Sequence, residues 1–270
     1  MFEMSKFSLK GKTAIVTGGG RGIGQAIAIG FAKAGAKVVV TSRKIEDLQA
    51  TADLIKSFGG EAYPISAHLG KLEEIQKMVD TAMEKLGGRI DILVNNAGAS
   101  PTMCSVLDTE ERLWDAVINL NLKGVYFASK ICANIMKKQG GGKIINIASI
   151  DGFKPEKGVS VYSVSKTGCR GVTWAFASEL APYNIQVNTI APGPIDTKMM
   201  QSHWAQLSPE EAEKQRKELN QVLPMHRMGQ PDEIAGAAIY LASDASSYTT
   251  GTEIVIDGGV LLMGLQAIHD

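Results

Sequence analysis

The sequence is poor in the residues that build disulfide frameworks and metal sites. Its three cysteines form no C-x-x-C pair, and its four histidines are scattered along the chain. Zinc sites and disulfide scaffolds need such residues at short, regular spacings. We therefore expect no metal site and no disulfide framework, and a reducing compartment such as the cytoplasm fits this cysteine usage.

The chain also lacks an excess of charge of one sign and any long hydrophobic run. Lys plus Arg and Asp plus Glu each number 28, so no net charge attracts the protein to phosphate backbones or anionic lipid. No segment offers the roughly 18 consecutive apolar residues of a membrane-spanning helix, and the N-terminal segment has no signal-type apolar stretch. We expect a soluble cytoplasmic protein whose partners include neither nucleic acid nor membranes.

What the chain does contain is enough apolar material for a large core, since 44% of its 270 residues are hydrophobic. β-Branched segments that end in turn residues alternate with segments whose apolar residues lie three and four positions apart. The expected strands cover residues 12–17, 37–42, 61–66, 90–95, 143–149, 185–191 and 253–257. This alternation predicts one α/β domain over residues 1–270, a doubly wound (Rossmann-type) parallel sheet of about seven strands with helices on both faces. Pro64 has no N–H for a sheet ladder, which favours an edge position for its strand, as the third strand has in the order 3-2-1-4-5-6.

Residues 198–223 interrupt the alternation of strands and helices. Ser208, Pro209 and Glu211 match an N-cap, a first-turn proline and a capping box, so a short charged helix is expected to begin there. We interpret the segment as a lid over a substrate, and a surface helical hairpin is the alternative. The apolar wall of this lid would come from Met199, Met200 and Trp204.

A glycine-rich loop, TGGGRGIG at residues 17–24, follows the first expected strand and opens the first expected helix. A tight turn needs a residue without Cβ, and a pyrophosphate can approach a helix N-terminus only where side chains are absent. Gly18, Gly22 and Gly24 provide those positions. Glycines can also serve close helix packing alone, but the strand, loop and helix context predicts a dinucleotide site.

The end of the second expected strand bears on which dinucleotide binds. An acidic residue about 20 positions after the glycines is typical of NAD sites, whereas arginine accommodates the 2′-phosphate of NADP. This chain has Ser42 and Arg43 there. Because arginine can bind phosphate through two charge-assisted hydrogen bonds, we expect NADP(H) to be favoured, with NAD(H) as the alternative. An exposed arginine at the start of a helix is the competing interpretation.

Two Tyr-x-x-x-Lys pairs are candidates for acid–base chemistry. Tyr162 and Lys166 occur in YSVSK, and Tyr126 and Lys130 repeat the spacing in YFASK. This spacing puts both side chains on one helix face. Tyr162 is favoured because its helix begins after the fifth strand, near the carboxyl edge where doubly wound sheets bind ligands. Ser149, at the end of that strand, can orient a substrate carbonyl or simply form a turn.

Hydride chemistry gives such a pair a role. Hydride transfer to a carbonyl leaves an alkoxide that must be protonated, and a phenol with an ordinary pKa of ~10 acts near neutrality only if its phenolate is stabilised. Lys166 can supply that stabilisation together with an oxidised nicotinamide.

Across nearly its whole length the chain resembles the classical short-chain dehydrogenase/reductase family. The resemblance is carried by TGGGRGIG, by NNAG at residues 95–98, by NLNLKG, by IAS followed by YSVSK, and by PGPIDT. It implies an NAD(P)-dependent oxidoreductase that interconverts a carbonyl and a secondary alcohol. The tetrad that it implies is Asn121, Ser149, Tyr162 and Lys166. Tyr162 would be the acid/base and Asn121 would hold a water of the proton relay, and Asn119 aligns less well for that role.

The resemblance also implies the residues that contact the cofactor. They are Gly18, Arg21, Gly22, Ile23, Gly24, Ser42, Arg43, His68, Leu69, Asn95, Ala97, Gly98, Tyr162, Lys166, Pro192, Gly193, Ile195 and Thr197. His68 and Leu69 depart from the acid and apolar residue usual in the family, and Ala148 stands where many members have a second serine.

The motifs leave the substrate open among simple ketones, sugar-derived polyols, steroids and β-ketoacyl thioesters. A β-ketoacyl thioester reductase of the same family and a non-catalytic nucleotide sensor on the same fold are the alternative functions. A methyltransferase is disfavoured because it normally has an acidic residue at the position of Ser42. The resemblance implies a homotetramer or homodimer, and the apolar tail at residues 260–268 would be costly to leave in water.

Overall fold

The computed structural model describes residues 3–100, 102–204 and 207–263. Its strands are β1 (Thr13–Thr17), β2 (Lys37–Ser42), β3 (Glu61–Ser66), β4 (Ile92–Asn95), β5 (Gly142–Ile147), β6 (Ile185–Pro192) and β7 (Glu253–Ile256). In the described residues they form one parallel sheet in the order β3-β2-β1-β4-β5-β6-β7. The predicted doubly wound sheet is confirmed, and the strand that contains Pro64 lies at its edge.

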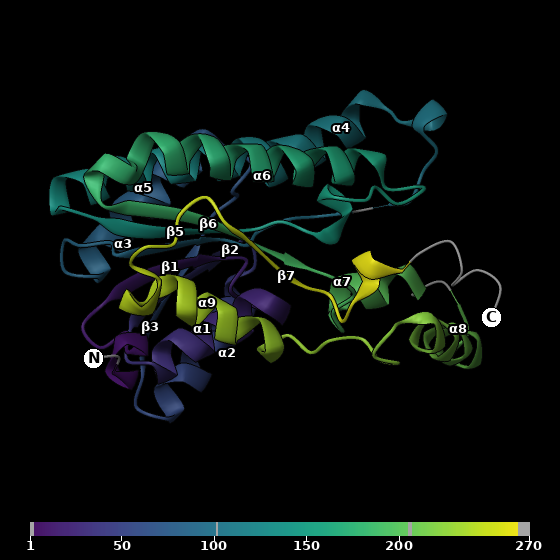
Figure 1. Ribbon diagram of the computed structural model, residues 1–270, viewed down its shortest axis with the longest axis horizontal. Helices are drawn as coiled ribbons and strands as arrows, with labels where there is room; N and C mark the ends of the chain where they lie inside the picture. The colour runs from purple at the N-terminus through teal and green to yellow at the C-terminus, as the bar shows by residue number, and fades with distance from the viewer. Residues whose placement is uncertain (1–2, 101, 205–206, 264–270) are drawn as a thin grey trace.

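Helices cover both faces of the sheet (Figure 1). The α-helices are α1 (Gly22–Lys33), α2 (Ile45–Ser57), α3 (Leu72–Lys85), α4 (Glu111–Ile118), α5 (Gly124–Gln139), α6 (Ser160–Leu180), α7 (Lys198–Gln201), α8 (Pro209–Val222) and α9 (Asp232–Ala242). A π-helical turn, η3 (Asn119–Lys123), joins α4 to α5. The 3₁₀ segments are η1 (Met4–Phe7), η2 (Val106–Asp108), η4 (Ile150–Gly152), η5 (Ala181–Tyr183), η6 (Ser202–Trp204), η7 (Asp244–Ser246) and η8 (Val260–Leu262).

The strands are apolar throughout because both of their faces are buried. Successive side chains of a strand point to opposite faces of the sheet. Val38 and Val40 therefore pack in the core beneath α1, α2 and α9. Val39, between them, packs in the second core, beneath α3 and α5. With helices on both faces, the carboxyl edge of the sheet is where ligands bind in such folds.

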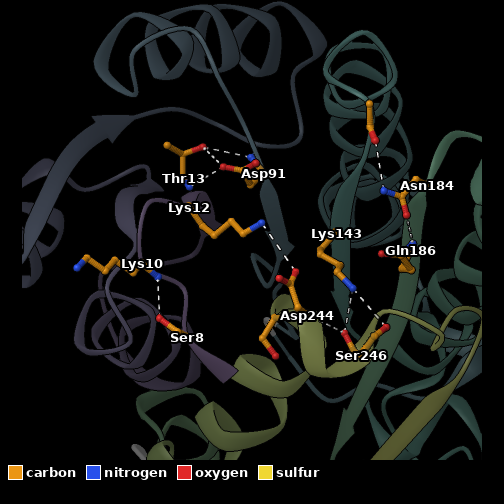
Figure 2. Close-up of polar contacts among 12 residues, drawn as sticks. Ser8, Lys10, Lys12, Thr13, Asp91, Lys143, Asn184, Gln186, Asp244 and Ser246 are labelled. Carbon is orange, nitrogen blue, oxygen red and sulfur yellow. Dashed lines mark hydrogen bonds and ion pairs between the residues drawn. The ribbon is translucent and has the colours of Figure 1, made fainter. Parts of the chain in front are cut away.

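Polar contacts close the opposite, amino edge of the sheet (Figure 2). The backbone N–H of Thr13 donates to Asp91 Oδ2 at 2.9 Å. Lys143 Nζ, buried at the start of β5, donates to the carbonyl and hydroxyl oxygens of Ser246 at 3.3 and 3.1 Å. Burial lowers the pKa of Lys143 to about 8, against the opposing effect of Asp244. This end of the sheet is thus tied to η7.

The described residues of the segment 198–223 include α7, η6 and α8, and the predicted capping box is confirmed. Ser208 Oγ accepts from the N–H of Glu211, whose carboxylate accepts from the N–H of Ser208 at 2.9 Å. α8 buries none of its residues and extends away from the sheet (Figure 1). Arg216 Nη2 on this helix donates to Asp196 Oδ2 at 2.7 Å, which links α8 to the loop after β6. The lid role of the segment stays a prediction.

Some expectations concern residues outside the described part of the chain. The apolar tail is described only as far as Met263, with Leu262 88% exposed, and the rest of it, residues 264–268, lies outside. Within the described residues, no helix is long and apolar enough to cross a membrane. In that same part of the chain, no group of three or more His, Cys, Asp or Glu residues could hold a metal ion.

Candidate active site

The proposed tetrad gathers at the carboxyl edge of the sheet, beside the end of β5. Lys166, 5% exposed in α6, donates from Nζ to the carbonyl of Ile147 at 2.8 Å. A Cβ on Gly98 would lie 3.4 Å from Asn121 Oδ1 and 3.5 Å from Lys166 Nζ. The loop after β4, the turn η3 and the helix α6 therefore meet around Gly98.

Asn121 lies in the π-helical turn and its amide is almost fully engaged by the protein. Oδ1 accepts from the N–H of Ala99 at 2.9 Å, and Nδ2 donates to the carbonyl of Ala99 at 2.9 Å and to Ser165 Oγ at 3.1 Å. Ser165 Oγ in turn donates to the carbonyl of Tyr162 at 2.6 Å. Both N–H groups of the amide are used, so its side chain retains only an oxygen lone pair for a water.

Ser149 lies between β5 and η4, where it forms a turn and also lies close to Tyr162. Its Oγ accepts from the N–H of Asp151 at 3.1 Å and donates to Asp151 Oδ2 at 3.1 Å. Burial raises the pKa of Asp151, and Glu156 adds to this increase. The turn uses the hydroxyl oxygen as an acceptor, so the two interpretations of this serine from the sequence are compatible if its hydrogen, which points to Asp151 in this structure, turns to a substrate carbonyl.

Burial shifts the pKa values of Tyr162 and Lys166 in opposite directions, each toward the neutral form. It raises the pKa of Tyr162 well above the ordinary value, and the hydroxyl of Ser149 partly offsets this increase. It lowers the pKa of Lys166, which Cys169 and Asp151 oppose. Lys166 Nζ lies 5.5 Å from the centre of the Tyr162 ring. The protein thus holds a phenol that keeps its proton at neutral pH.

The second Tyr-x-x-x-Lys pair lies on the surface of α5. Tyr126 is 43% exposed and packs edge-on against Phe176, with ring centres 5.0 Å apart. Lys130 Nζ lies 5.8 Å from the centre of the Phe127 ring. This pair belongs to an aromatic surface cluster and not to the edge of the sheet.

The glycine-rich loop has the shape of a phosphate cradle. Gly18 has a φ of +66°, and a Cβ there would lie 2.6 Å from Asn96 Nδ2, which donates to the carbonyl of Thr17 at 2.9 Å. A Cβ on Gly22, whose φ is +56°, would lie 3.3 Å from Thr197 Cγ2. Since α1 begins at Gly22, its first N–H groups face this loop. The residues present therefore fit a dinucleotide pyrophosphate, with Thr197 across from the loop.

Ser42 ends β2 and Arg43 follows it directly. This end of the strand lies beside the glycine-rich loop, because the N–H groups of Gly18 and Gly19 donate to the carbonyl of Thr41. The backbone carbonyl of Arg43 accepts from Ser66 Oγ at 3.0 Å. Its exposed guanidinium forms no ion pair or side-chain hydrogen bond with any described residue. Arg21, at the start of α1, is likewise exposed. These two cations are open to an anion.

Several other predicted contact residues have side chains that the protein itself engages. Asn95 Nδ2 donates to Ser129 and Asn146 at 2.9 and 2.8 Å. Leu69 is 5% exposed within the apolar core, and His68 Nδ1 accepts from the N–H of Gly70 at 3.1 Å. Contacts of Asn95 and Leu69 to a cofactor would thus come from the backbone.

The remaining predicted contact residues surround the same edge. The N–H of Ala97 donates to Thr17 Oγ1 at 3.0 Å. Gly193 donates to the carbonyl of Ile256 at 2.9 Å, directly after Pro192 ends β6. Ile195 belongs to the core beneath α1, and Ile23 packs against this core. The loop after β6 is thereby fixed between β7 and the glycine-rich loop.

Comparison with known proteins identifies the family. The chain matches a family model described as enoyl-(acyl carrier protein) reductase over residues 18–261. Human dehydrogenase/reductase SDR family member 4 is 39% identical over 251 residues, which cover 93% of this chain and 88% of that protein. The chain belongs to the short-chain dehydrogenase/reductase (SDR) family.

Solved structures of SDR proteins agree with the fold and differ in cofactor. A 7α-hydroxysteroid dehydrogenase in complex with NADH and 7-oxo glycochenodeoxycholic acid has a TM-score of 0.88 and 35% identity, with 96% of this chain and 98% of that chain covered. A candidate NAD(P)-dependent gluconate 5-dehydrogenase from Beutenbergia cavernae, with NADP bound at low occupancy, has a TM-score of 0.86 and 36% identity, with 96% and 100% covered. As an SDR protein, this chain is an oxidoreductase.

Three residues near the site were missed by reasoning from the sequence. Ser165 and Asn96 lie inside the motifs YSVSK and NNAG, yet their role in holding Asn121 and the glycine-rich loop depends on contacts between distant elements. Asp151 follows the IAS motif and belongs to no recognised pattern. The sequence signal that could have pointed to Asp151 is its acidic side chain, two positions after the candidate catalytic residue Ser149.

Proposed function

We propose that this SDR protein transfers a hydride between NADP(H) and a carbonyl or secondary alcohol substrate, with Tyr162 as the general acid/base. The observation that carries the proposal is the convergence of Ser149, Tyr162 and buried Lys166 at the end of β5. When bound, the nicotinamide donates or accepts the hydride. A non-catalytic nucleotide sensor could use Lys166 to contact the cofactor, but it would not need a buried phenol beside this lysine at the end of β5.

In this proposal the residues of the chain divide the proton chemistry among them. Ser149 donates a hydrogen bond to the substrate carbonyl and fixes its orientation. Tyr162, which burial keeps protonated, donates its proton to the oxygen that gains charge during reduction. Lys166 stabilises the phenolate that remains, from its position over the ring. Asn121 holds the start of α6 through Ser165 and offers its free lone pair to a relay water.

The preference for NADP(H) rests on the end of β2. Arg43 and Arg21 are exposed cations beside the glycine-rich loop, and Ser42 replaces the acidic residue of NAD sites. One solved relative carries NADH and the other carries NADP. Family membership therefore does not decide between NAD(H) and NADP(H), and the residues at the end of β2 must do so. NAD(H) is the alternative cofactor.

The proposal extends to the surroundings of the site. Residues 198–223 act as a lid, because α7 follows Thr197 directly and α8 is attached to the body through Arg216 and Asp196. The protein is a homotetramer or homodimer, and it works in the cytoplasm, as its cysteine usage suggests. Its substrate is a small molecule.

A second candidate, reduction of a β-ketoacyl thioester, is favoured by 38% identity over 254 residues to the 3-oxoacyl-[acyl-carrier-protein] reductase FabG of Thermotoga maritima. One assay on a panel of substrates separates the candidates, and it follows reduced nicotinamide by absorbance. Ketones, ketosteroids and β-ketoacyl thioesters are offered with NADPH and NADH, and secondary alcohols and polyols are offered with NADP⁺ and NAD⁺. We expect turnover of non-thioester carbonyls with NADPH. Turnover of thioesters alone would support the second candidate, and turnover of no substrate with either cofactor would contradict the enzyme assignment.

A further inference from the structure

Asp151 is a charged residue at the site that the proposed reaction does not use. It lies in η4, two residues after Ser149, and its carboxylate accepts the hydroxyl hydrogen of Ser149 at 3.1 Å. It is close enough to Tyr162 to raise the pKa of the phenol and close enough to Lys166 to be stabilised by the ammonium group. The carboxylate therefore borders the place where the carbonyl would react.

The role proposed for Ser149 removes the hydrogen bond that Asp151 receives. A serine hydroxyl has a single hydrogen to donate, and that hydrogen points to Asp151 in this structure. When Ser149 turns to donate to a substrate carbonyl, the carboxylate loses this donor. Asp151 is partly buried, so a substrate that displaces the remaining water would leave this carboxylate without a partner, which is costly.

Neighbouring side chains in the described residues do not replace that donor. The ammonium group of Lys166 favours the carboxylate through its charge, but it donates to the carbonyl of Ile147 and forms no hydrogen bond with Asp151. Its two remaining N–H groups are those that the proposed function directs to Tyr162 and the cofactor. Glu156, the other charged neighbour, is itself acidic and raises the pKa of Asp151 further. A replacement donor must therefore come from the substrate or from water.

We propose that Asp151 is a specificity residue that binds a hydroxyl group on the carbon next to the reacting carbonyl. The substrate class is then α-hydroxy ketones in the direction of reduction and vicinal diols in the direction of oxidation. The substrate hydroxyl donates to the Asp151 carboxylate while its neighbouring carbonyl accepts from Ser149. This inference rests on the proposed function and narrows its substrate class.

The same geometry disfavours other substrates. A ketone with a methyl group in place of the hydroxyl leaves the carboxylate unpaired, and a site built to bind a hydroxyl discriminates strongly against such an analogue. A substrate with a carboxylate beside its carbonyl places two negative charges close together, which is also unfavourable.

The experiment compares ketones that differ only in this hydroxyl. The first pair is 2-hydroxyacetophenone and propiophenone, and the second is hydroxyacetone and butanone, each reduced with NADPH. The wild type should favour the hydroxy ketone in kcat/KM by about ten- to a hundredfold, as expected for one hydrogen bond to a charged group. In Asp151→Leu this ratio should fall to about 1, whereas Glu156→Gln, which changes the neighbouring acid, should keep the wild-type ratio.

Asp151→Asn preserves the shape of the side chain and serves if the leucine variant does not fold, as judged by thermal melting and NADPH binding. Its ratio should lie several-fold below that of the wild type, because the charge is lost. A wild-type ratio near 1, or a ratio unchanged in both Asp151 variants, would overturn the inference while ketone reduction itself stands. Reduction of neither member of either pair would overturn it as well, and the proposed function would then be judged on the other ketones of the panel.

Discussion

Single residues of this protein carry charge in two very different settings. Lys166 is buried, and burial lowers its pKa, so its charge depends on the few groups around it. Arg43 is exposed at the end of β2, where water screens its charge until a ligand displaces that water. An exposed cation of this kind contributes little to folding, so its replacement should report on ligand binding alone.

Arg43→Ala should lower kcat/KM with NADPH by about ten- to a hundredfold and leave kcat/KM with NADH nearly unchanged. The reason is the loss of one charge-assisted hydrogen bond to the 2′-phosphate, worth about 1.5–3 kcal/mol. Lys44→Ala, which removes the neighbouring exposed cation, is the matched control and should have a smaller effect. Equal use of both cofactors by the wild type would exclude the predicted preference.

At this scale the sequence predicts residue types better than it predicts contacts. The glycines of the cofactor loop were predictable because a positive φ and a close approach exclude side chains, as at Gly18. The engagement of Asn95 by Ser129 and Asn146 was not. Those partners are 34 and 51 residues away, and no local pattern encodes them.

Among whole elements, α8 makes few contacts that would hold it in place. α8 buries none of its residues, and the Arg216 to Asp196 ion pair joins it to the loop after β6. A helix with so little buried surface can move at low cost in free energy. This supports the predicted lid, whose tryptophan, Trp204, is half-buried in η6.

Trp204→Ala should raise KM about tenfold for bulky apolar ketones and change KM little for small ones, because a large apolar contact with the substrate is lost. Steady-state kinetics on a size-graded ketone series measures this, alongside thermal melting. Tyr248→Ala, which truncates a fully exposed aromatic residue beside η7, is the control. A lower melting temperature with uniform kinetics would show that Trp204 packs on the body of the protein.

The periodicity of the sequence predicts regular elements and fails at irregular ones. The capping box fixed the start of α8 because Ser208 and Glu211 satisfy each other's backbone groups locally. The π-helical turn at Asn119–Lys123 had no such signal. Its geometry follows from packing of α4 and α5 and from the ties of Asn121 to Ala99 and Ser165.

At the scale of the whole molecule, several aromatic and apolar residues of α5 and α6 are exposed. Tyr126, Val164 and Trp174 are 43%, 49% and 49% exposed. Apolar patches of this kind mark interaction surfaces, and a symmetric copy of the same surface is the commonest partner. This observation adds to the apolar tail as a reason to expect an oligomer.

Sedimentation velocity at micromolar concentration should therefore detect a dimer or tetramer. Replacing Trp174 with Asp should shift the distribution toward smaller species, since the charge would be buried at the contact. Tyr248→Asp, at the amino edge of the sheet, should leave the distribution unchanged. A wild type that sediments as a monomer would exclude the predicted assembly.

The order of the strands was predictable at this scale for two reasons. Each strand–helix–strand unit places its second strand parallel to the first in the same sheet, and Pro64 favours an edge position for its strand. The relation of α8 to the sheet was not, since its polar surface fits many positions equally well. The fold therefore follows from apolar pattern, whereas the mouth of the site depends on a few polar contacts such as Arg216 with Asp196.

The central claim is that Tyr162, and not Tyr126, transfers the proton during hydride transfer. The most direct test takes a ketone that the wild type reduces and measures its turnover by Tyr162→Phe and by Tyr126→Phe. Cofactor binding and thermal melting are measured on both variants. Only the ionisable oxygen is removed, so Tyr162→Phe should fold, bind cofactor and lose at least about a hundredfold in kcat, while Tyr126→Phe stays near the wild type. An active Tyr162→Phe variant beside an inactive Tyr126→Phe variant would contradict the claim.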